Sequence, residues 1–189
     1  MKTLEEIRKV IDGIDPQIRT LMMERLDCSY QVAEAKQAAG STDIYRAERE
    51  NAMLEKLGAE VPEDRRAGYL AVVRKITETS RMYQYGLLYD WNPGIFQTIT
   101  GSELLTGPTE RVKVRLTRQD RPNAMSAILA MVGDYGYNMD RMELIGSDPV
   151  QKSVTFDLTI LGDLTQEHMK KLIFQLSKES ALFCILELS

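Results

Sequence analysis

A long predicted helix near the start of the chain carries cations on its apolar side. The same three-four spacing that defines this side leads from Leu21 to Arg25 and from Val32 to Lys36, and Arg8 lies at its edge, one turn after Leu4. Such spacing is typical of a helix face that packs against other helices. The apolar residues that follow it are Leu4, Ile7, Ile11, Ile14, Ile18, Leu21, Met22, Val32 and Ala35.

A cation on a buried face costs several kcal/mol unless an anion and hydrogen bonds compensate it. For one such residue, the ordinary interpretation is that its stem covers apolar surface while its charge reaches water. Arg8, Arg25 and Lys36 together favour a different interpretation. We expect a pocket for an anionic ligand inside a helical bundle.

Composition limits the class of protein. The chain has 189 residues and a net charge of −4, so it can form one large domain or two small ones and has no overall attraction for nucleic acid or anionic membranes. Cys28 and Cys184 lack metal-ligand spacing and are predicted to be buried thiols. The start lacks the apolar core of a signal peptide, and no apolar run is long enough to span a membrane. We therefore expect a cytoplasmic protein without a metal.

The first ninety residues predict an all-helical domain (1–90). One helix over 4–38, kinked at Asp15-Pro16, explains the unbroken apolar spacing, although two helices joined at Asp15 are an alternative. A second helix is predicted over 46–57, and a third begins at Pro62 and reaches residue 89.

Residues 91–110 are rich in Gly, Pro, Ser and Thr and are predicted to be a linker. From residue 111 onward, period-two and period-3.6 segments alternate in the order strand, helix, strand, strand, helix, strand. This order predicts an α+β, ferredoxin-like βαββαβ domain over 111–189, with strands near 111–116, 137–145, 154–160 and 181–188 and helices near 123–134 and 165–176.

Five motifs of the first ninety residues, in order, resemble the all-helical chorismate mutase domain. They are IRKVIDGID with Arg8, MERLDCS with Arg25, VAEAK with Lys36, IYRAERE with Arg49 and Glu50, and ITETSRMYQ with Ser80 and Gln84. The resemblance implies an intertwined helical homodimer that rearranges chorismate to prephenate in phenylalanine and tyrosine biosynthesis. Because this rearrangement is internal to the substrate, no cofactor or metal is expected.

The resemblance also implies roles for these residues. Arg25 would hold one substrate carboxylate, and Arg8 would hold the other from the partner subunit. Lys36 and Gln84 would face the ether oxygen, and Glu50 would accept a hydrogen bond from the ring hydroxyl. The residues implied to support the anionic side of the substrate or to line the pocket are Ser80, Arg49 and Arg46, the last standing where many family members have Asp.

The last eighty residues resemble an ACT domain, which is a small-molecule sensing module. Its usual Asp-x-Pro-Gly turn corresponds to residues 120–123, with Asn in place of Gly, and its Gly-x-Asn corresponds to 136–138. The resemblance implies an amino-acid effector, and the segment 143–146 lacks the Glu-Ser-Arg-Pro of phenylalanine-sensing dehydratases. The candidate effector-binding residues are Asp120, Asn123, Ala124, Met125 and Asn138.

Two other functions fit parts of the pattern. An isochorismate-pyruvate lyase uses a closely similar cationic pocket, and a non-catalytic regulatory subunit would use the helices only to bind a metabolite. Glu50 and Gln84 favour the mutase over the lyase, and retention of Arg25 and Lys36 argues against a lost activity. The linker is too short to hold a dehydratase domain.

Overall fold

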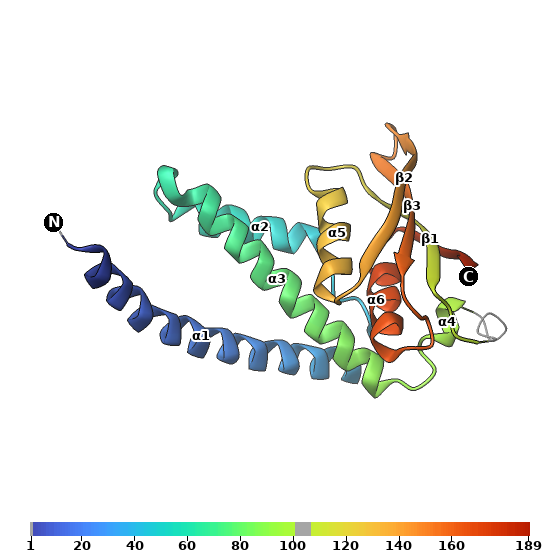
Figure 1. Ribbon diagram of the computed structural model, residues 1–189, viewed down its shortest axis with the longest axis horizontal. Helices are drawn as coiled ribbons and strands as arrows, with labels where there is room; N and C mark the ends of the chain where they lie inside the picture. The colour runs from blue at the N-terminus through green and yellow to red at the C-terminus, as the bar shows by residue number, and fades with distance from the viewer. Residues whose placement is uncertain (1, 101–106) are drawn as a thin grey trace. The chain divides into compact units, whose positions relative to one another are not determined.

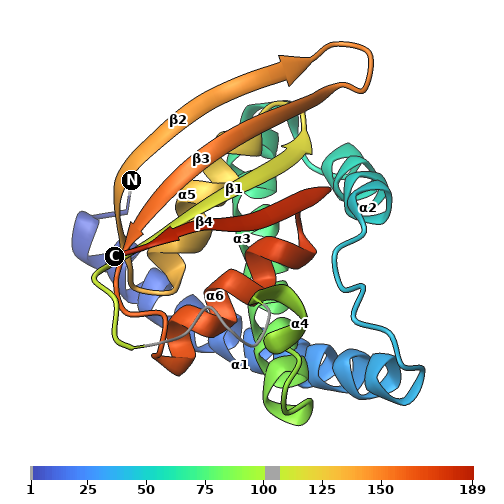
Figure 2. The same ribbon diagram turned by 90° about the vertical axis from the view of Figure 1, so that its right-hand side faces the viewer.

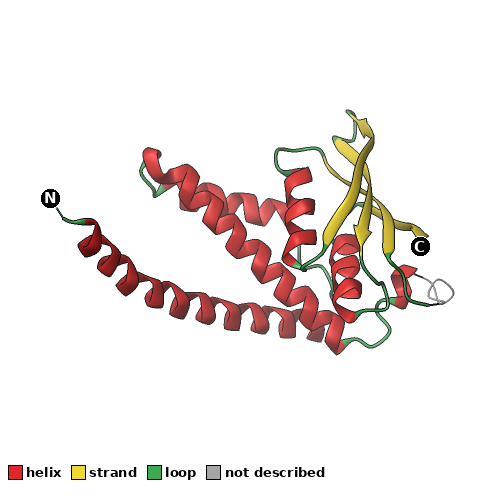
Figure 3. Ribbon diagram, in the orientation of Figure 1, coloured by secondary structure: helices red, strands yellow, loops and turns green. Residues whose placement is uncertain are grey.

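The computed structural model describes residues 2–100 and 107–189. The chain forms two compact units, and the boundary between them along the sequence falls between Leu87 and Leu88. Figures 1 and 3 show helices in the first unit and helices with a sheet in the second. The helices are α1 (Leu4–Ala38), α2 (Ala47–Ala59), α3 (Glu63–Trp91), α4 (Gln97–Thr100), α5 (Ala124–Asp134) and α6 (Glu167–Lys178). The strands are β1 (Arg111–Gln119), β2 (Asn138–Asp148), β3 (Ser153–Leu161) and β4 (Leu182–Leu188).

Helix α1 is a single element, so the alternative of two helices joined at Asp15 is wrong. Its start is a capping box, in which Thr3 Oγ1 accepts from the Glu6 N–H and the Glu6 carboxylate accepts from the Thr3 N–H. Pro16 lies inside the helix, which Figure 1 draws as a gradual curve. Gly40, at φ +63°, follows the helix in the left-handed conformation that glycine adopts without strain.

The apolar side of α1 was expected to pack against other helices, and within one chain this is wrong for its first two thirds. From Leu4 to Leu21, the exposed fraction of the apolar side chains on this side ranges from 43% at Ile7 to 64% at Leu21. On the whole helix only Ser29 and Ala33 are buried, and both lie in the final third. The periodicity identified an apolar face correctly, but the rest of one chain leaves most of that face in water.

Helices α2 and α3 agree with the predicted segments to within two residues at each end. Arg46 precedes α2 in an extended conformation, and Pro62 precedes α3. Arg66 on α3 donates from Nε to the carbonyl of Gly58 at 2.8 Å, which joins the two helices at their turn. A Cβ on Gly58 would lie 3.2 Å from Leu70, so this turn also depends on a small residue.

The described part of the predicted linker belongs to the second unit. Helix α4 lies in it, and Phe96 just before α4 is buried. The rings of Phe96 and Phe174 lie 6.4 and 6.0 Å from that of Tyr89, measured between centroids. Residues 101–106 of the predicted linker lie outside the described residues.

The second unit contains one four-stranded sheet in the order β2-β3-β1-β4, and every neighbouring pair is antiparallel. Figure 2 shows the sheet with α5 and α6 on one face. The buried apolar side chains of β1 and β3 fall on every second residue, so they share one face of the sheet and form a core with buried apolar residues of the two helices. This core includes Val112, Val114, Leu116, Phe156, Leu158, Ile160, Ile128, Val132, Leu172, Ile173 and Leu176.

The hairpin between β2 and β3 differs from the predicted one. The sequence predicted a turn at residues 146–149, but β2 continues through Asp148 and the turn occupies the residues between Asp148 and Ser153. Asp148 Oδ1 accepts from the N–H groups of Val150 and Gln151 at 2.8 and 3.0 Å. The side chain of Asp148 therefore starts the turn at residue 148, two residues later than the Gly146-Ser147 pair suggested.

Candidate functional site

A cavity of about 510 Å³ lies among the helices of the first unit. Its lining comes from α1, from the extended segment before α2, from α2 and from α3. The lining residues are Arg25, Cys28, Ser29, Val32, Lys36, Ile44, Arg46, Arg49, Glu50, Met53, Thr77, Ser80, Arg81 and Gln84.

Helix α1 supplies two cations to the cavity. Arg25 donates from Nη1 to Ser80 Oγ on α3, and Lys36 donates from Nζ to the backbone carbonyl of Asp43. Arg25 and Lys36 are 11 residues apart, close to three helical turns, so both fall on the same face of α1. The helix thereby presents both charges to one wall of the cavity.

The ammonium of Lys36 has a pKa below the usual value for lysine. Partial burial is the main cause, and the nearby charge of Arg46 is the next, while Asp43 acts in the opposite direction. Arg49 lowers the pKa of Lys36 further. The charges of Arg46 and Arg49 near Lys36 make this part of the cavity suited to an anion.

Helix α2 and its N-cap contribute residues at helical spacing. Arg46, Arg49, Glu50 and Met53 follow steps of three and four, so they share the face of α2 that borders the cavity. Arg46 and Arg49 are exposed. Their guanidinium groups are therefore free to approach a ligand without first losing a buried contact.

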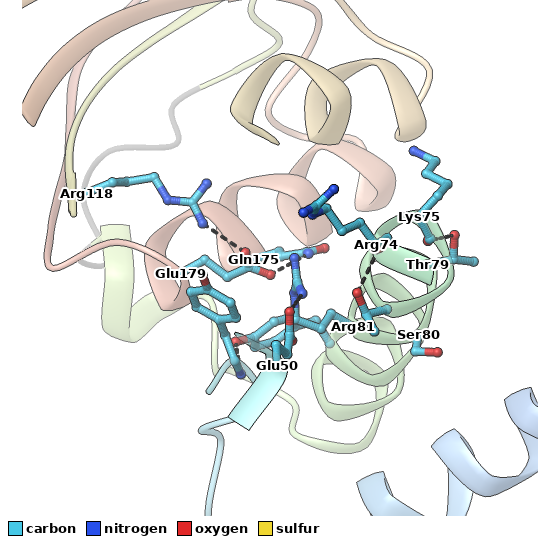
Figure 4. A network of polar contacts seen from close by, with 12 residues as sticks. Glu50, Arg74, Lys75, Thr79, Ser80, Arg81, Arg118, Gln175 and Glu179 are labelled. Atoms are coloured by element: carbon cyan, nitrogen blue, oxygen red, sulfur yellow. Dashed lines mark hydrogen bonds and ion pairs between the residues drawn. The ribbon is translucent and has the colours of Figure 1, made fainter. Parts of the chain in front are cut away.

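Helix α3 supplies a row of buried polar side chains: Thr77, Ser80, Arg81 and Gln84. Arg81 Nη1 lies 2.5 Å from Glu50 Oε2, and these side chains are only 9% and 23% exposed (Figure 4). Sequence reasoning missed Arg81. The signal was present, because Arg81 lies four residues after Thr77 and three before Gln84, on the same side of the helix.

The cavity is therefore electrically asymmetric. Its lining in the described part of the chain contains five cations, Arg25, Lys36, Arg46, Arg49 and Arg81, and one carboxylate, Glu50. Apolar side chains complete the wall at Val32, Ile44 and Met53. This arrangement can hold a small polyanionic ligand with an apolar body and direct fixed donors at an oxygen that gains charge.

The structure brings together seven of the eight residues predicted for substrate binding and catalysis in the first unit. The exception is Arg8, which is exposed and does not belong to the described lining of the cavity. Arg8 and Arg25 are 17 residues apart on α1, which is roughly 26 Å along the helix axis. Within one chain Arg8 cannot reach a ligand held by Arg25.

The predicted effector residues are only partly adjacent. Asn123 caps α5 with φ +69°, so it adopts the left-handed conformation that the usual glycine would take. It lies with Asp120, Ala124 and Met125 at the turn after β1.

Asn138 does not face that turn within one chain. It pairs with Leu161, which pairs with Arg111 at the start of β1, whereas Gln119 at the end of β1 pairs with Ser153. The two ends are roughly 26 Å apart along the strands. The reason is topological. Both β1 and β2 are antiparallel to β3, so β2 begins at the end of the sheet where β1 begins, whereas the turn of Asn123 follows the other end of β1.

Among residues 2–100 and 107–189, no cluster of His, Cys, Asp or Glu could hold a metal ion, and no helix is long and apolar enough to cross a membrane. Cys28 and Cys184 are free thiols, but both are exposed, so the prediction that they are buried is wrong.

Comparison with known proteins concerns the first unit. Residues 7–85 match the model of the family described as chorismate mutase type II. No curated protein matches the chain. The matched segment contains every residue that lines the cavity.

Proposed function

We propose that the chain is a homodimeric chorismate mutase, which rearranges chorismate to prephenate. The observation that carries the proposal is the convergence of Arg25, Lys36, Glu50 and Gln84 on one cavity, inside the segment that matches the family model. Conversion of chorismate by the purified chain tests it.

The chemistry explains why this cavity suits the reaction. Chorismate is a dicarboxylate in which one C–O bond breaks and one C–C bond forms without any external reagent. The enzyme has to hold the reactive conformer and stabilise the charge that develops on the ether oxygen. Lys36 and Gln84 are the donors for that oxygen, and Arg25 binds a carboxylate through its planar guanidinium.

Glu50 accepts a hydrogen bond from the ring hydroxyl in this proposal. Ser80 holds the Arg25 guanidinium, which supports its orientation toward the substrate. Arg46 and Arg49 complete the positive wall and bind the anionic side of the substrate.

The homodimer accounts for two features of α1. The apolar residues from Leu4 to Leu21 are exposed in one chain, and a second copy would cover them. Arg8 lies on the same part of the helix. In a paired arrangement it would enter the cavity of the partner and bind the second carboxylate, as the resemblance implies.

An isochorismate-pyruvate lyase is the alternative within the same fold. The carboxylate of Glu50 and the buried amide of Gln84 favour the mutase. Assaying both substrates with the same preparation separates the two functions, because only the lyase releases pyruvate. A non-catalytic regulatory subunit would convert neither substrate.

Burial is the main cause of the lowered pKa of Lys36, and Arg46 lowers this pKa further, so Arg46 is predicted to shift the alkaline limit of activity. Because Arg46 lowers the pKa of Lys36, Lys36 loses its charge at a lower pH than an ordinary lysine. Activity that needs the charged Lys36 falls as the pH rises through that pKa. In Arg46→Ala the pKa of Lys36 rises, so the alkaline limb of kcat/KM should move to higher pH.

The measurement is kcat/KM for chorismate across the alkaline range. Arg65→Ala is the control, because Arg65 is exposed, pairs with Asp64 and does not border the described cavity. An alkaline limb that stays in place in Arg46→Ala would contradict this role.

The second unit supports a regulatory role. Its βαββαβ order with the antiparallel sheet β2-β3-β1-β4 fits the ferredoxin-like arrangement of ACT domains. The backbone N–H groups at the start of α5 favour a carboxylate, so we propose an amino-acid effector at the turn of Asp120, Asn123, Ala124 and Met125. In this proposal Asn138 comes from another copy, because the strand register separates it from the turn of its own chain.

Calorimetry of the full chain with phenylalanine, tyrosine and tryptophan tests this proposal. At least one should bind and change the mutase rate, and Asn123→Pro should abolish that binding because proline cannot adopt the positive φ. Absence of binding by all three, together with unchanged activity, would reject the sensing role for these ligands.

A further inference from the structure

Arg81 is a buried cation that has no role in the chemistry proposed above. Its side chain is 9% exposed and lies at the cavity wall, where Nη1 is 2.5 Å from Glu50 Oε2 (Figure 4). The guanidinium carbon lies 4.7 Å from the centroid of the Tyr45 ring. Arg81 thus contacts the only carboxylate in the described lining of the cavity.

The surroundings of Arg81 fix it in place. The face of the Tyr45 ring attracts the guanidinium, and the Tyr45 N–H donates to Tyr85 Oη at 3.2 Å. Tyr85 is 1% exposed, so this contact anchors the segment before α2 to α3. Burial of Arg81 and its aromatic contact leave little freedom for the guanidinium to leave Glu50.

The pairing determines what Glu50 can accept. Oε2 carries the contact with Arg81, and no hydrogen bond to Oε1 is found in the described part of the chain. Oε1 can therefore accept from a neutral hydroxyl. An ammonium at the same place would meet the positive charge of Arg81 next to Glu50, and like charges in a partly buried site repel strongly.

We propose that Arg81 determines specificity at the ring position of the substrate, by making Glu50 select a neutral hydroxyl over an ammonium. The inference rests on the proposed function, in which Glu50 binds the ring hydroxyl. Arg25, Lys36, Arg46 and Arg49 also border the cavity, and the two carboxylates of the substrate offset two of these four charges. Arg81 differs from these four because its charge contacts Glu50 itself.

The experiment compares two substrates: chorismate and the analogue that carries a protonated amino group in place of the ring hydroxyl. The selectivity is the ratio of their kcat/KM values, measured on the same preparation of the full chain. A loss of folded protein lowers both values equally and cancels in the ratio. The ratio therefore reports on recognition and is not changed by a purely structural role of Arg81.

Arg81→Met removes the charge while keeping a long side chain, and the ratio should move toward the amino analogue by about tenfold or more. Arg81→Gln, a polar neutral variant, should move it in the same direction. Arg81→Lys retains the charge and should keep the ratio within about twofold of the wild type. Arg66→Met is the matched control, since Arg66 also joins α3 to α2 but does not border the described cavity.

An unchanged ratio in both neutral variants would overturn the inference while leaving the mutase activity of the wild type intact. A shift of similar size in Arg81→Lys or Arg66→Met would also overturn it, because charge at Arg81 would not be the cause. Failure of the wild type to convert chorismate is a different result. It would reject the proposed function and this inference with it.

Discussion

Replacing Lys36 with Ala is expected to lower kcat by about a hundredfold or more, because it removes a fixed donor to an oxygen that gains charge in the transition state. Lys36 lines the cavity, and its pKa is lowered by burial and by neighbouring cations. Steady-state kinetics with chorismate measures the effect. The loss should appear in kcat, since the donor acts more strongly on the transition state than on the bound substrate.

Lys36 also has a structural contact, which the experiment has to separate from catalysis. Its ammonium donates to the carbonyl of Asp43, so the variant loses a hydrogen bond that joins α1 to the segment before α2. Thermal unfolding followed by circular dichroism checks that Lys36→Ala stays folded. Lys56→Ala is the matched control, because Lys56 lies in the last turn of α2 and does not border the described cavity. Wild-type kcat in a folded Lys36→Ala protein would rule out the donor role.

A mixture of two inactive variants is expected to regain activity if Arg8 serves the cavity of the partner subunit. After subunit exchange, an Arg8→Ala chain paired with a Lys36→Ala chain forms one cavity that holds both residues and one that holds neither. With equal mixing, half of the dimers are mixed and each has one intact cavity. Activity should then approach about a quarter of the wild-type value.

The control mixture pairs Arg25→Ala with Lys36→Ala. Arg25 and Lys36 border the same cavity of one chain, so no exchange can produce a cavity with both residues intact. This mixture should stay inactive. If exchange is verified by mass and the Arg8 mixture also stays inactive, Arg8 does not act across the interface.

Much of the first unit could be predicted from the sequence because its signals are local. Apolar spacing, the Pro62 start and the Gly40 end are properties of neighbouring residues, and they gave α1, α2 and α3 nearly to their ends. Arg25 and Lys36 could be placed in one cavity because three-four steps put them on one face of α1. Helical periodicity converts sequence distance into position in space.

The remaining features depend on contacts between elements. The pairing of Arg81 with Glu50 joins α3 to α2, and no spacing within either helix indicates it. The separation of Asn138 from the turn at Asn123 follows from strand register, which the order of elements alone does not supply. The apolar face from Leu4 to Leu21 was identified correctly, but spacing within one helix does not tell that the rest of the chain leaves this face exposed.

The most direct test of the proposed function follows the loss of chorismate absorbance in a solution of the purified protein, with formation of prephenate confirmed by its acid-catalysed conversion to phenylpyruvate. Wild type and Lys36→Ala are measured side by side at equal concentration. The proposal predicts rapid conversion by the wild type, without added cofactor or metal, and near-background conversion by the variant. Equal rates in the two proteins, or no conversion by the wild type, would contradict it.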